Sequence, residues 1–420
     1  MIKDILQENE IKRDKITELL KSSKVVISLG TNIPGTDKHT YQAYFILHFF
    51  KNILKETLTF KEVIFTNSVY MYYLITIEEE DAKTIKEKMI CIEETHMIGR
   101  YIDIDVYEYA EKSLSRNSLG YRNRKCYICD KDAHECARAQ AHNREIIIED
   151  ITLYIDTFIR SQVLQDIDKA IMTELELEDK YGLVTRFSSG SHSDMDYLKM
   201  VSAKNAILDY FKRMFIVGLK SEVIHDSLET VRPVAIEAEE NMFQVTFGVN
   251  CYKGLIYVLG ITLIACGHTL RNLGCLEDVF KNIAIISKDV LHEFNLEGDS
   301  FGYQTFRKHN ITGIRGEVNK GLPSLQLVLP ILYESINYSS LHKALNELII
   351  EAEDTVLLKR SGSIDKYYEV KNIVKKLDST SVEDIKNFTT LAIENNWSFG
   401  GSADLLIVGI YLRFFKDFIC

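Results

Sequence analysis

The hydrophobic pattern of the chain changes at about residue 160, and this change limits its fold more than any other feature. Before that point, short apolar or strictly alternating segments, which are typical of strands, lie between segments with apolar residues at helical spacing. After it, strand patterns nearly vanish and helical spacing dominates. The sequence therefore predicts an α/β or α+β first domain, residues 1–160, and an all-α second domain, residues 161–420.

The expected elements follow from these spacings. Ile16, Leu19 and Leu20 lie three and four residues apart and place the first helix. The first domain is predicted to contain helices at 11–20, 41–55 and 80–93, strands at 25–29, 71–77 and 101–107, and a turn at 32–35. The second is predicted to contain helices at 161–178, 195–218, 233–246, 253–272, 276–294, 325–337, 340–353, 364–377, 382–395 and 402–417. No Pro/Gly/Ser-rich linker occurs at 150–165, so we expect a helix to join the domains.

Composition supports two folded domains and limits the classes of ligand that they can bind. A chain of 420 residues is longer than one core usually supports. Its 46% hydrophobic residues and only 4 prolines argue against disorder. The net charge of -11 argues against a general nucleic-acid binder. A local exception is the basic window 116–144, in which seven basic residues outnumber three acidic ones and which suits a polyphosphate.

Three further features bear on location and redox state. The first residues lack the apolar stretch of a secretory signal, so we expect a cytoplasmic protein. The apolar run 255–266 is shorter than the roughly 20 residues that span a bilayer, which predicts a buried helix and no membrane partner. Eight cysteines in such a chain argue against a disulfide framework and leave reduced core thiols or a metal site.

Two aspartates stand out in the segment 99–107, Gly-Arg-Tyr-Ile-Asp-Ile-Asp-Val-Tyr. Residues two apart on a strand share a face, so Asp103 and Asp105 should project together. Neighbouring carboxylates repel unless a cation joins them, and Mg²⁺ held by one or two carboxylates plus substrate phosphates is usual in phosphoryl and nucleotidyl transfer. A solvated edge strand is the alternative. Arg100 and the basic window favour the Mg²⁺ site.

The basic window also contains a set of metal-ligand residue types at Cys126, Cys129, Cys136 and His142. A Cys-x2-Cys pair followed by a Cys and a His offers the four ligands of a tetrahedral zinc site. The second half is not a regular pair, so reduced thiols packed beside a basic helix are the alternative. Under either interpretation, Arg138 and Arg144 are candidates for binding pyrophosphate.

Short motifs of glycine and charged residues recur along the second part of the chain. Glycines that open helices leave backbone N–H groups and a positive helix end available to phosphate, and carboxylates nearby suit Mg²⁺ or a developing cationic sugar. A single such motif is more often a helix cap, but their number indicates a site. The candidate residues are Arg186, Asp194, Glu239, Asn250, Lys253, Arg315, Glu317, Asp354, Arg360, Ser402 and Asp404.

Three segments of the first part, 28–35, 99–107 and 124–142, together resemble the apo-citrate lyase phosphoribosyl-dephospho-CoA transferase family over nearly all of 1–150. The resemblance implies a nucleotidyltransferase-like domain that moves the phosphoribosyl-dephospho-CoA group onto a serine of the acyl-carrier (gamma) subunit of citrate lyase and releases pyrophosphate. It also implies Asp103 and Asp105 as the Mg²⁺ pair, with Asn32 and Arg100 as substrate contacts.

The glycine and charge motifs of the second part resemble the triphosphoribosyl-dephospho-CoA synthase family over about 165–420. This all-α enzyme joins ATP and dephospho-CoA with loss of adenine. The chain departs from the family pattern at Asp179, Tyr181, Cys251, Tyr252, Phe301, Val356 and Lys359, where Pro, Pro, Thr, His, His, Asn and His are usual. The charged residues of the motifs are kept.

The two resemblances predict a bifunctional transferase, because the product of the second domain is the substrate of the first. Ribose C1 of ATP would be attacked by a hydroxyl of dephospho-CoA, and Glu239, Asp354 and Asp404 are candidates to stabilise the sugar or Mg²⁺. The same chemistry for the carrier of malonate decarboxylase is an alternative, as is a zinc-stabilised nucleic-acid-binding module on a helical scaffold. The motifs of the first part favour citrate lyase, and the overall acidity argues against nucleic acid.

Overall fold

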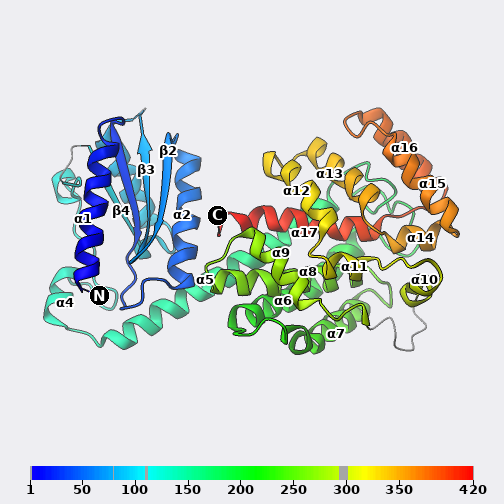
Figure 1. Cartoon of the computed structure of the whole chain (residues 1–420), viewed down its shortest axis with the longest axis horizontal. Helices are drawn as coiled ribbons and strands as arrows, with labels where there is room; N and C mark the ends of the chain where they lie inside the picture. Colours follow the sequence, from blue (N-terminus) through cyan, green and yellow to red (C-terminus); the bar gives the residue numbers. More distant parts are fainter. Residues whose placement is uncertain (1, 79, 109–111, 293–300, 420) are drawn as a thin grey trace. The chain divides into compact units, whose positions relative to one another are not determined.

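In the computed structural model, which describes residues 2–78, 80–108, 112–292 and 301–419, the chain divides into two units (Figure 1). Unit 1 contains Met1–Ile159 together with Asp417–Cys420, and unit 2 contains Arg160–Lys416. Helix α5, Arg144–Leu175, carries the chain from the first unit into the second. The absence of a flexible linker at 150–165 predicted such a helix.

Unit 1 is built on a four-stranded sheet in the order β2-β3-β1-β4. Its strands are β1 (Val25–Thr31), β2 (Glu62–Asn67), β3 (Met71–Ile77) and β4 (Ile102–Tyr107). Every neighbouring pair is antiparallel, so of the two predicted fold classes the structure corresponds to α+β. The sequence did not predict β2, an edge strand whose side chains are mostly exposed and therefore lack a clear apolar pattern.

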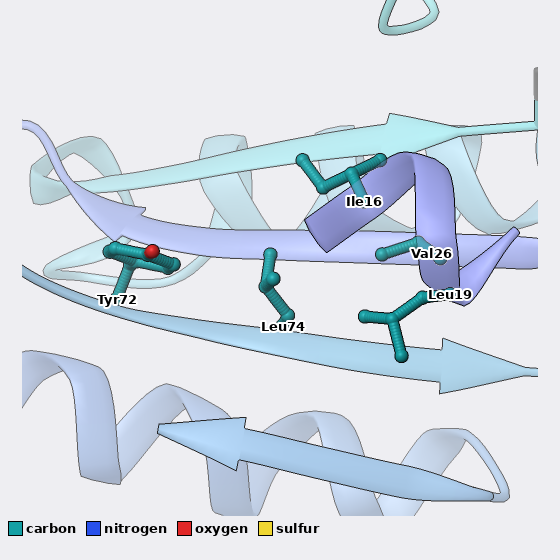
Figure 2. Packing of buried hydrophobic residues seen from close by; sticks show 5 residues of the cluster. All are labelled: Ile16, Leu19, Val26, Tyr72 and Leu74. Atoms are coloured by element: carbon teal, nitrogen blue, oxygen red, sulfur yellow. The ribbon is translucent and has the colours of Figure 1, made fainter. Parts of the chain in front are cut away.

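Helices cover both faces of this sheet. In unit 1, α1 (Ile2–Leu19) lies on one face and α2 (Tyr41–Thr57) on the other (Figure 1). Figure 2 shows that Ile16 and Leu19 of α1 meet Val26, Tyr72 and Leu74 of the sheet. These side chains are at most 8% exposed, and burying each aliphatic one contributes about 1.5–3 kcal/mol. The predicted helix through Ile16 and Leu19 is therefore confirmed.

Residues 417–419 pack in unit 1, whereas the pattern of the sequence placed 161–420 in the second domain. Phe418 lies 5.0 Å from Phe45 of α2 between ring centroids. Tyr44 donates its hydroxyl to the carbonyl of Ile419 at 2.8 Å, and Asn52 donates to the carbonyl of Asp417 at 2.6 Å. Aromatic burial and these hydrogen bonds hold the last residues on α2.

Helices make up unit 2, and no strand forms within its described residues. After α5 come α6 (Tyr197–Lys220), α7 (Ser227–Val245), α8 (Lys253–Arg271), α9 (Leu276–Ile286), α10 (Phe301–His309), α11 (Ile314–Asn319), α12 (Pro323–Glu334), α13 (Tyr338–Glu351), α14 (Thr355–Ser361), α15 (Ile364–Lys375), α16 (Val382–Glu394) and α17 (Gly400–Lys416). The predicted all-α second part is confirmed.

Boundaries differ from the prediction where local signals were weak. Helix α7 begins at Ser227 and takes Pro233 into its interior, although the predicted segment began at that proline. Helix α9 ends at Ile286 instead of 294, and residues 293–294 of that prediction lie outside the described residues. The short helices α10, α11 and α14 were not predicted, because six to nine residues hold too few turns for a clear periodicity.

Helix α8 is the central apolar helix of unit 2. Of the helices that the structure describes, α8 is the one long and apolar enough to cross a membrane by length and composition. However, 78% of its apolar window is buried inside the protein, and a core helix passes the same test. The apolar run 255–266 therefore forms a buried helix, as predicted.

Candidate functional sites in the two units

A pocket of about 1140 Å³ in unit 1 collects most of the candidate residues of the first part of the chain. It is lined by Asn32, Arg100, Asp103, Asp105 and Arg144, together with the further cations Lys38, Lys86, Arg116, Arg124 and Lys125. Its volume is slightly above the usual range for small-molecule sites, which suits a ligand as large as a nucleotide conjugate. A cationic wall with two carboxylates is suited to a polyphosphate and a metal ion.

The two aspartates lie on β4, on the face of the sheet that α1 partly covers. Asp103 pairs with Gly30 of β1 and Asp105 pairs with Ser28. The carboxylate of Asp103 is 54% exposed, whereas Asp105 is half-buried. Burial and the neighbouring Asp103 raise the pKa of Asp105. The strand spacing therefore places both carboxylates in the pocket, where the charge of Asp103 disfavours ionisation of Asp105.

Aromatic stacking orders one cationic side of the pocket. The guanidinium of Arg100 lies 4.4 Å from the ring centroid of Tyr127 and donates to the carbonyl of Lys125. Tyr127 donates its hydroxyl to the carbonyl of Asn32 at 2.6 Å and stacks on Tyr101 at 6.0 Å between centroids. These contacts connect the end of β1 to the basic window and hold Arg100 in position beside the pocket.

Glu93 of α3 (Ala82–Thr95) anchors two arginines of the pocket and was not predicted. Its buried carboxylate accepts Arg124 Nη2 on Oε1 and Arg116 Nη2 on Oε2, both at 2.7 Å. Oε1 also accepts the backbone N–H of Ile104 at 3.1 Å, and Arg124 lies 3.4 Å from Asp103. In sequence Glu93 is one of many charged residues of a surface-like helix, so no local signal marks it.

Close packing of the segment before β4 holds α3 against the aspartate strand. A Cβ on Gly99 would lie 2.5 Å from the carbonyl oxygen of Ile92, which is closer than any side chain allows. Glycine at this position lets the chain pass directly over the end of α3 and return as β4. Lys86 of α3 donates to the carbonyl of Ile104 at 2.6 Å, and burial lowers its pKa.

The cysteine and histidine candidates form a cluster at the edge of the same pocket. One ligand atom from each of Cys126, Cys129, Cys136 and His142 lies within 4.8 Å of all the others. Cys126, Cys136 and His142 also line the pocket. In contrast, Arg138 is exposed on α4 (Ala133–Ala139) and is not part of the pocket lining.

In unit 2, Asp354 uses both carboxylate oxygens to hold helix starts together. Oδ1 accepts the N–H groups of Val356 and Leu357 at 2.9 and 3.1 Å, which caps α14. Oδ2 accepts the N–H and the hydroxyl of Ser402, at the start of α17, at 2.8 and 2.9 Å. With 2% exposure, Asp354 is a buried cap shared by two helices.

Asp404 lies one turn into α17 and faces the start of α8. A Cβ on Gly254 would lie 2.1 Å from Asp404 Oδ2, so a side chain at this position would displace the carboxyl group. Burial, Asp354 and Glu174 together raise its pKa well above the ordinary value. Within the described part of the chain Asp404 has no hydrogen-bond partner. The carboxyl group of Asp404 is therefore not occupied by a structural hydrogen bond and is available to a ligand.

The remaining candidates of unit 2 form smaller groups. Lys253 Nζ lies 2.7 Å from Glu239, and the side chain of Asn250 accepts the N–H of Lys253 at 3.0 Å. Arg360 contacts His192 at 2.9 Å, and His192 lies 3.8 Å from Asp194.

The last candidate residues of unit 2 make two aromatic contacts and line one small cavity. The guanidinium of Arg186 lies 6.0 Å from the ring of Tyr197, and that of Arg315 lies 5.6 Å from Tyr303. Glu317 is buried, accepts the hydroxyl of Ser324 at 2.6 Å and lines a cavity of about 250 Å³. The structure thus distributes the candidates of unit 2 over several contact groups.

Comparisons with known proteins identify the class to which these sites belong. Residues 161–418 match the family described as ATP:dephospho-CoA triphosphoribosyl transferase, and the chain belongs to this family. Residues 1–158 match the apo-citrate lyase phosphoribosyl-dephospho-CoA transferase family. The two matches follow one another, so the chain is a fusion of two transferases that carries both activities.

Similar proteins match either most of the chain or about two thirds of it. The chain is 29% identical to "Protein CitXG" of Leuconostoc mesenteroides subsp. cremoris over 96% of its own length and 95% of that protein. It is 28% identical to "Protein CitXG" of Haemophilus influenzae, over 82% of the chain and 79% of the relative. A 2-(5''-triphosphoribosyl)-3'-dephosphocoenzyme-A synthase of Haemophilus ducreyi is 26% identical over 68% of the chain and 98% of the relative.

Proposed function

We propose that unit 1 modifies the acyl carrier of citrate lyase in its pocket and that unit 2 makes the prosthetic group at the starts of α8 and α17. The observation that supports this assignment most strongly is the meeting of Asp103, Asp105, Asn32 and Arg100 in one cationic pocket. A pyrophosphate leaving group needs cations around it, and the pocket offers them from Arg100 before β4, from Lys86 of α3 and from the basic window.

The carboxylate pair fits a divalent cation. Burial and the charge of Asp103 raise the pKa of Asp105, and a cation between the two groups would relieve that repulsion. We therefore assign Mg²⁺ to Asp103 and Asp105, where it would neutralise charge on the departing pyrophosphate. A carboxylate pair on a strand beside a pyrophosphate site also supports a nucleotidyltransferase-like unit 1.

The residues of unit 1 position the phosphates. The carrier serine attacks the phosphorus next to the ribose, a new P–O bond forms, and the bond to pyrophosphate breaks. Arg100, held by Tyr127, and Arg124, held by Glu93, take fixed positions before substrate binds. Fixed cations stabilise the charge that develops on the leaving group without reorganising during the reaction.

The residues of unit 2 act on the ribose of ATP. A hydroxyl of dephospho-CoA attacks C1, the bond to adenine breaks, and positive charge develops on the sugar while the triphosphate is retained. We assign Asp404 to the reacting sugar or its Mg²⁺, because the structural contacts leave it available. Lys253, beside Glu239, and Arg315 are assigned to the phosphates. Asp354 positions Asp404 by joining α14 to α17.

One incubation tests the function as a whole. The protein is mixed with ATP, dephospho-CoA and the apo-carrier of citrate lyase, the carrier is weighed by mass spectrometry, and the small molecules are separated by chromatography. We expect the carrier mass to increase by the phosphoribosyl-dephospho-CoA group and free adenine to accumulate without matching ADP or AMP. An unmodified carrier, or ADP in place of adenine, would contradict the proposal. The apo-carrier of malonate decarboxylase serves as the specificity control.

A further inference from the structure

We propose that Cys126, Cys129, Cys136 and His142 bind one Zn²⁺ that holds the basic wall of the unit 1 pocket in place. This site is structural and is separate from the Mg²⁺ site assigned to Asp103 and Asp105. Its function is to fold the segment 112–143, which supplies several cations of the pocket.

The spacing of the four ligand atoms fits tetrahedral zinc. Zn–S bonds of about 2.3 Å at tetrahedral angles place two thiolates about 3.8 Å apart, and a thiolate and an imidazole nitrogen slightly closer. Cys129 Sγ lies 3.5 Å from Cys136 Sγ and 3.4 Å from His142 Nε2. All four atoms lie within 4.8 Å of one another, so small side-chain shifts complete the tetrahedron.

Local structure brings the four residues together in spite of their irregular sequence spacing. The N–H of Cys126 donates to the carbonyl of Lys131 at 2.8 Å, which closes a tight loop around the Cys-x2-Cys pair. Cys136 lies on α4, which begins directly after this loop. Gln140 then adopts a left-handed conformation with φ of 48°, and this turn directs the chain back so that His142 meets the cysteines.

The segment lacks a core that could fold it without a metal ion. Between residues 112 and 143, all of which are described, only Cys126 and Cys136 are buried. The hydrophobic effect therefore contributes little to ordering about thirty residues, whose backbone entropy opposes folding by roughly 1–2 kcal/mol each. Small structures with so little apolar burial usually need a disulfide or a structural metal.

The alternatives fit the same observations less well. Packed thiols need an apolar environment, yet Cys129 is half-buried and an imidazole nitrogen lies 3.4 Å from its sulfur. A disulfide between Cys129 and Cys136 would leave Cys126 and His142 without a function at the centre of the cluster. Four zinc-type ligands directed at one point are accounted for together by a single metal ion.

The site connects to catalysis through Tyr127, which directly follows Cys126. Tyr127 supports Arg100 by stacking and holds the end of β1 by its bond to Asn32. Loss of the metal would release the loop that carries Tyr127, and with it Arg124, from the pocket. Zinc therefore acts on transfer through position alone, and it leaves the reaction of unit 2 unaffected.

The test uses the full chain and measures metal content before activity. Zinc per chain is determined by inductively coupled plasma mass spectrometry for the wild type and for His142→Ala, His142→Cys and Cys91→Ser. We expect about one zinc in the wild type and in His142→Cys, because four cysteines also form a zinc site. His142→Ala should retain less than about a tenth of it under a competing chelator. Cys91, an exposed cysteine of α3, is the matched control and should leave the zinc content unchanged.

Limited trypsin digestion provides a readout that does not depend on activity. The basic window contains seven lysines and arginines, so removing zinc should expose 116–144 to cleavage within minutes while unit 2 stays intact. His142→Cys should resist trypsin as the wild type does, which separates loss of metal from general misfolding. Metal-free protein with the window still protected, zinc retained in His142→Ala, or a Cys129–Cys136 disulfide found by peptide mass spectrometry would each overturn the proposal.

Discussion

Most candidate residues of unit 1 meet in one pocket, whereas those of unit 2 divide into several contact groups. Asp103 and Asp105 line the pocket beside its cations. Asp354 instead directs both oxygens at backbone and hydroxyl donors of its own unit. The contrast arises because a strand fixes which residues share a face, while a carboxylate at a helix start serves equally as a cap or as a ligand.

From this contrast we expect the largest loss of activity when the aspartate pair of β4 is changed. Asp103→Asn or Asp105→Asn should lower carrier modification by at least about 100-fold, because charge on the pyrophosphate is no longer neutralised. Adenine release by unit 2 should continue at the wild-type rate. Mass spectrometry of the carrier and chromatography of adenine measure the two rates on one sample. Asp130→Asn, a change of the same charge at a 95% exposed residue, is the control. Carrier modification by either variant at near the wild-type rate would contradict the assignment of Asp103 and Asp105 to the active site.

The corresponding change in unit 2 is Asp404→Asn. It should lower adenine release by about 100-fold, because it removes the carboxyl group that structural contacts leave available. The same variant should still modify the carrier when it receives preformed triphosphoribosyl-dephospho-CoA. Undiminished adenine release would show that the reaction of unit 2 takes place elsewhere.

Glu93→Gln tests how unit 1 holds its arginines in position. The amide keeps the shape of the side chain but removes the charge that fixes Arg116 and Arg124. Carrier modification should decrease by about 10–100-fold, with a higher KM for triphosphoribosyl-dephospho-CoA. Glu94→Gln is the matched control, because Glu94 is 52% exposed and contacts only Arg116 among the ion pairs of the described residues. Equal effects of the two variants would contradict a positioning function for Glu93.

Asp354→Asn separates structural capping from catalysis. It should lower the free energy of unfolding of unit 2 by about 1–2 kcal/mol, because one oxygen at the shared cap becomes a donor. Adenine release should decrease less than in Asp404→Asn. Chemical denaturation and the adenine assay together measure this, and a larger catalytic loss than that of Asp404→Asn without loss of stability would reverse the two assignments.

The smallest expected effect concerns acid stability and distinguishes the two units. Burial lowers the pKa of His48, on α2, to about 4. Between pH 6.5 and 4 the unfolded chain therefore binds a proton that the folded chain does not, and stability is lost as the pH falls. At pH 5.5 this loss is about 1 kcal/mol. His48→Phe should remove it from unit 1 but not from unit 2, where His192 and His342 also have a pKa of about 4. Thermal unfolding at pH 7 and 5.5 would show an unchanged pH dependence if His48 were not responsible.

The sequence alone predicted most of the longer helices and strands and the shared strand face of Asp103 and Asp105, because alternation and helical spacing are local properties. It did not predict Glu93, whose function depends on Arg116 and Arg124, more than twenty residues away. It did not predict β2 either, since an exposed edge strand has no apolar pattern. In unit 2 it grouped Asp354 with Asp404, because the hydrogen bonds that distinguish them form only after the helices pack.

Complementation between two inactivated chains tests most directly whether the two units perform separate and consecutive reactions. Asp103→Asn and Asp404→Asn are incubated with ATP, dephospho-CoA and the apo-carrier, first alone and then together, and the carrier is weighed. Each variant alone should modify the carrier about 100-fold more slowly than the wild type, with adenine released at the wild-type rate only by Asp103→Asn. Together they should modify it, since the product of one chain diffuses to the other. Modification by either variant alone at near the wild-type rate, or faster adenine release by Asp404→Asn than by Asp103→Asn, would contradict the division of the reactions between the units.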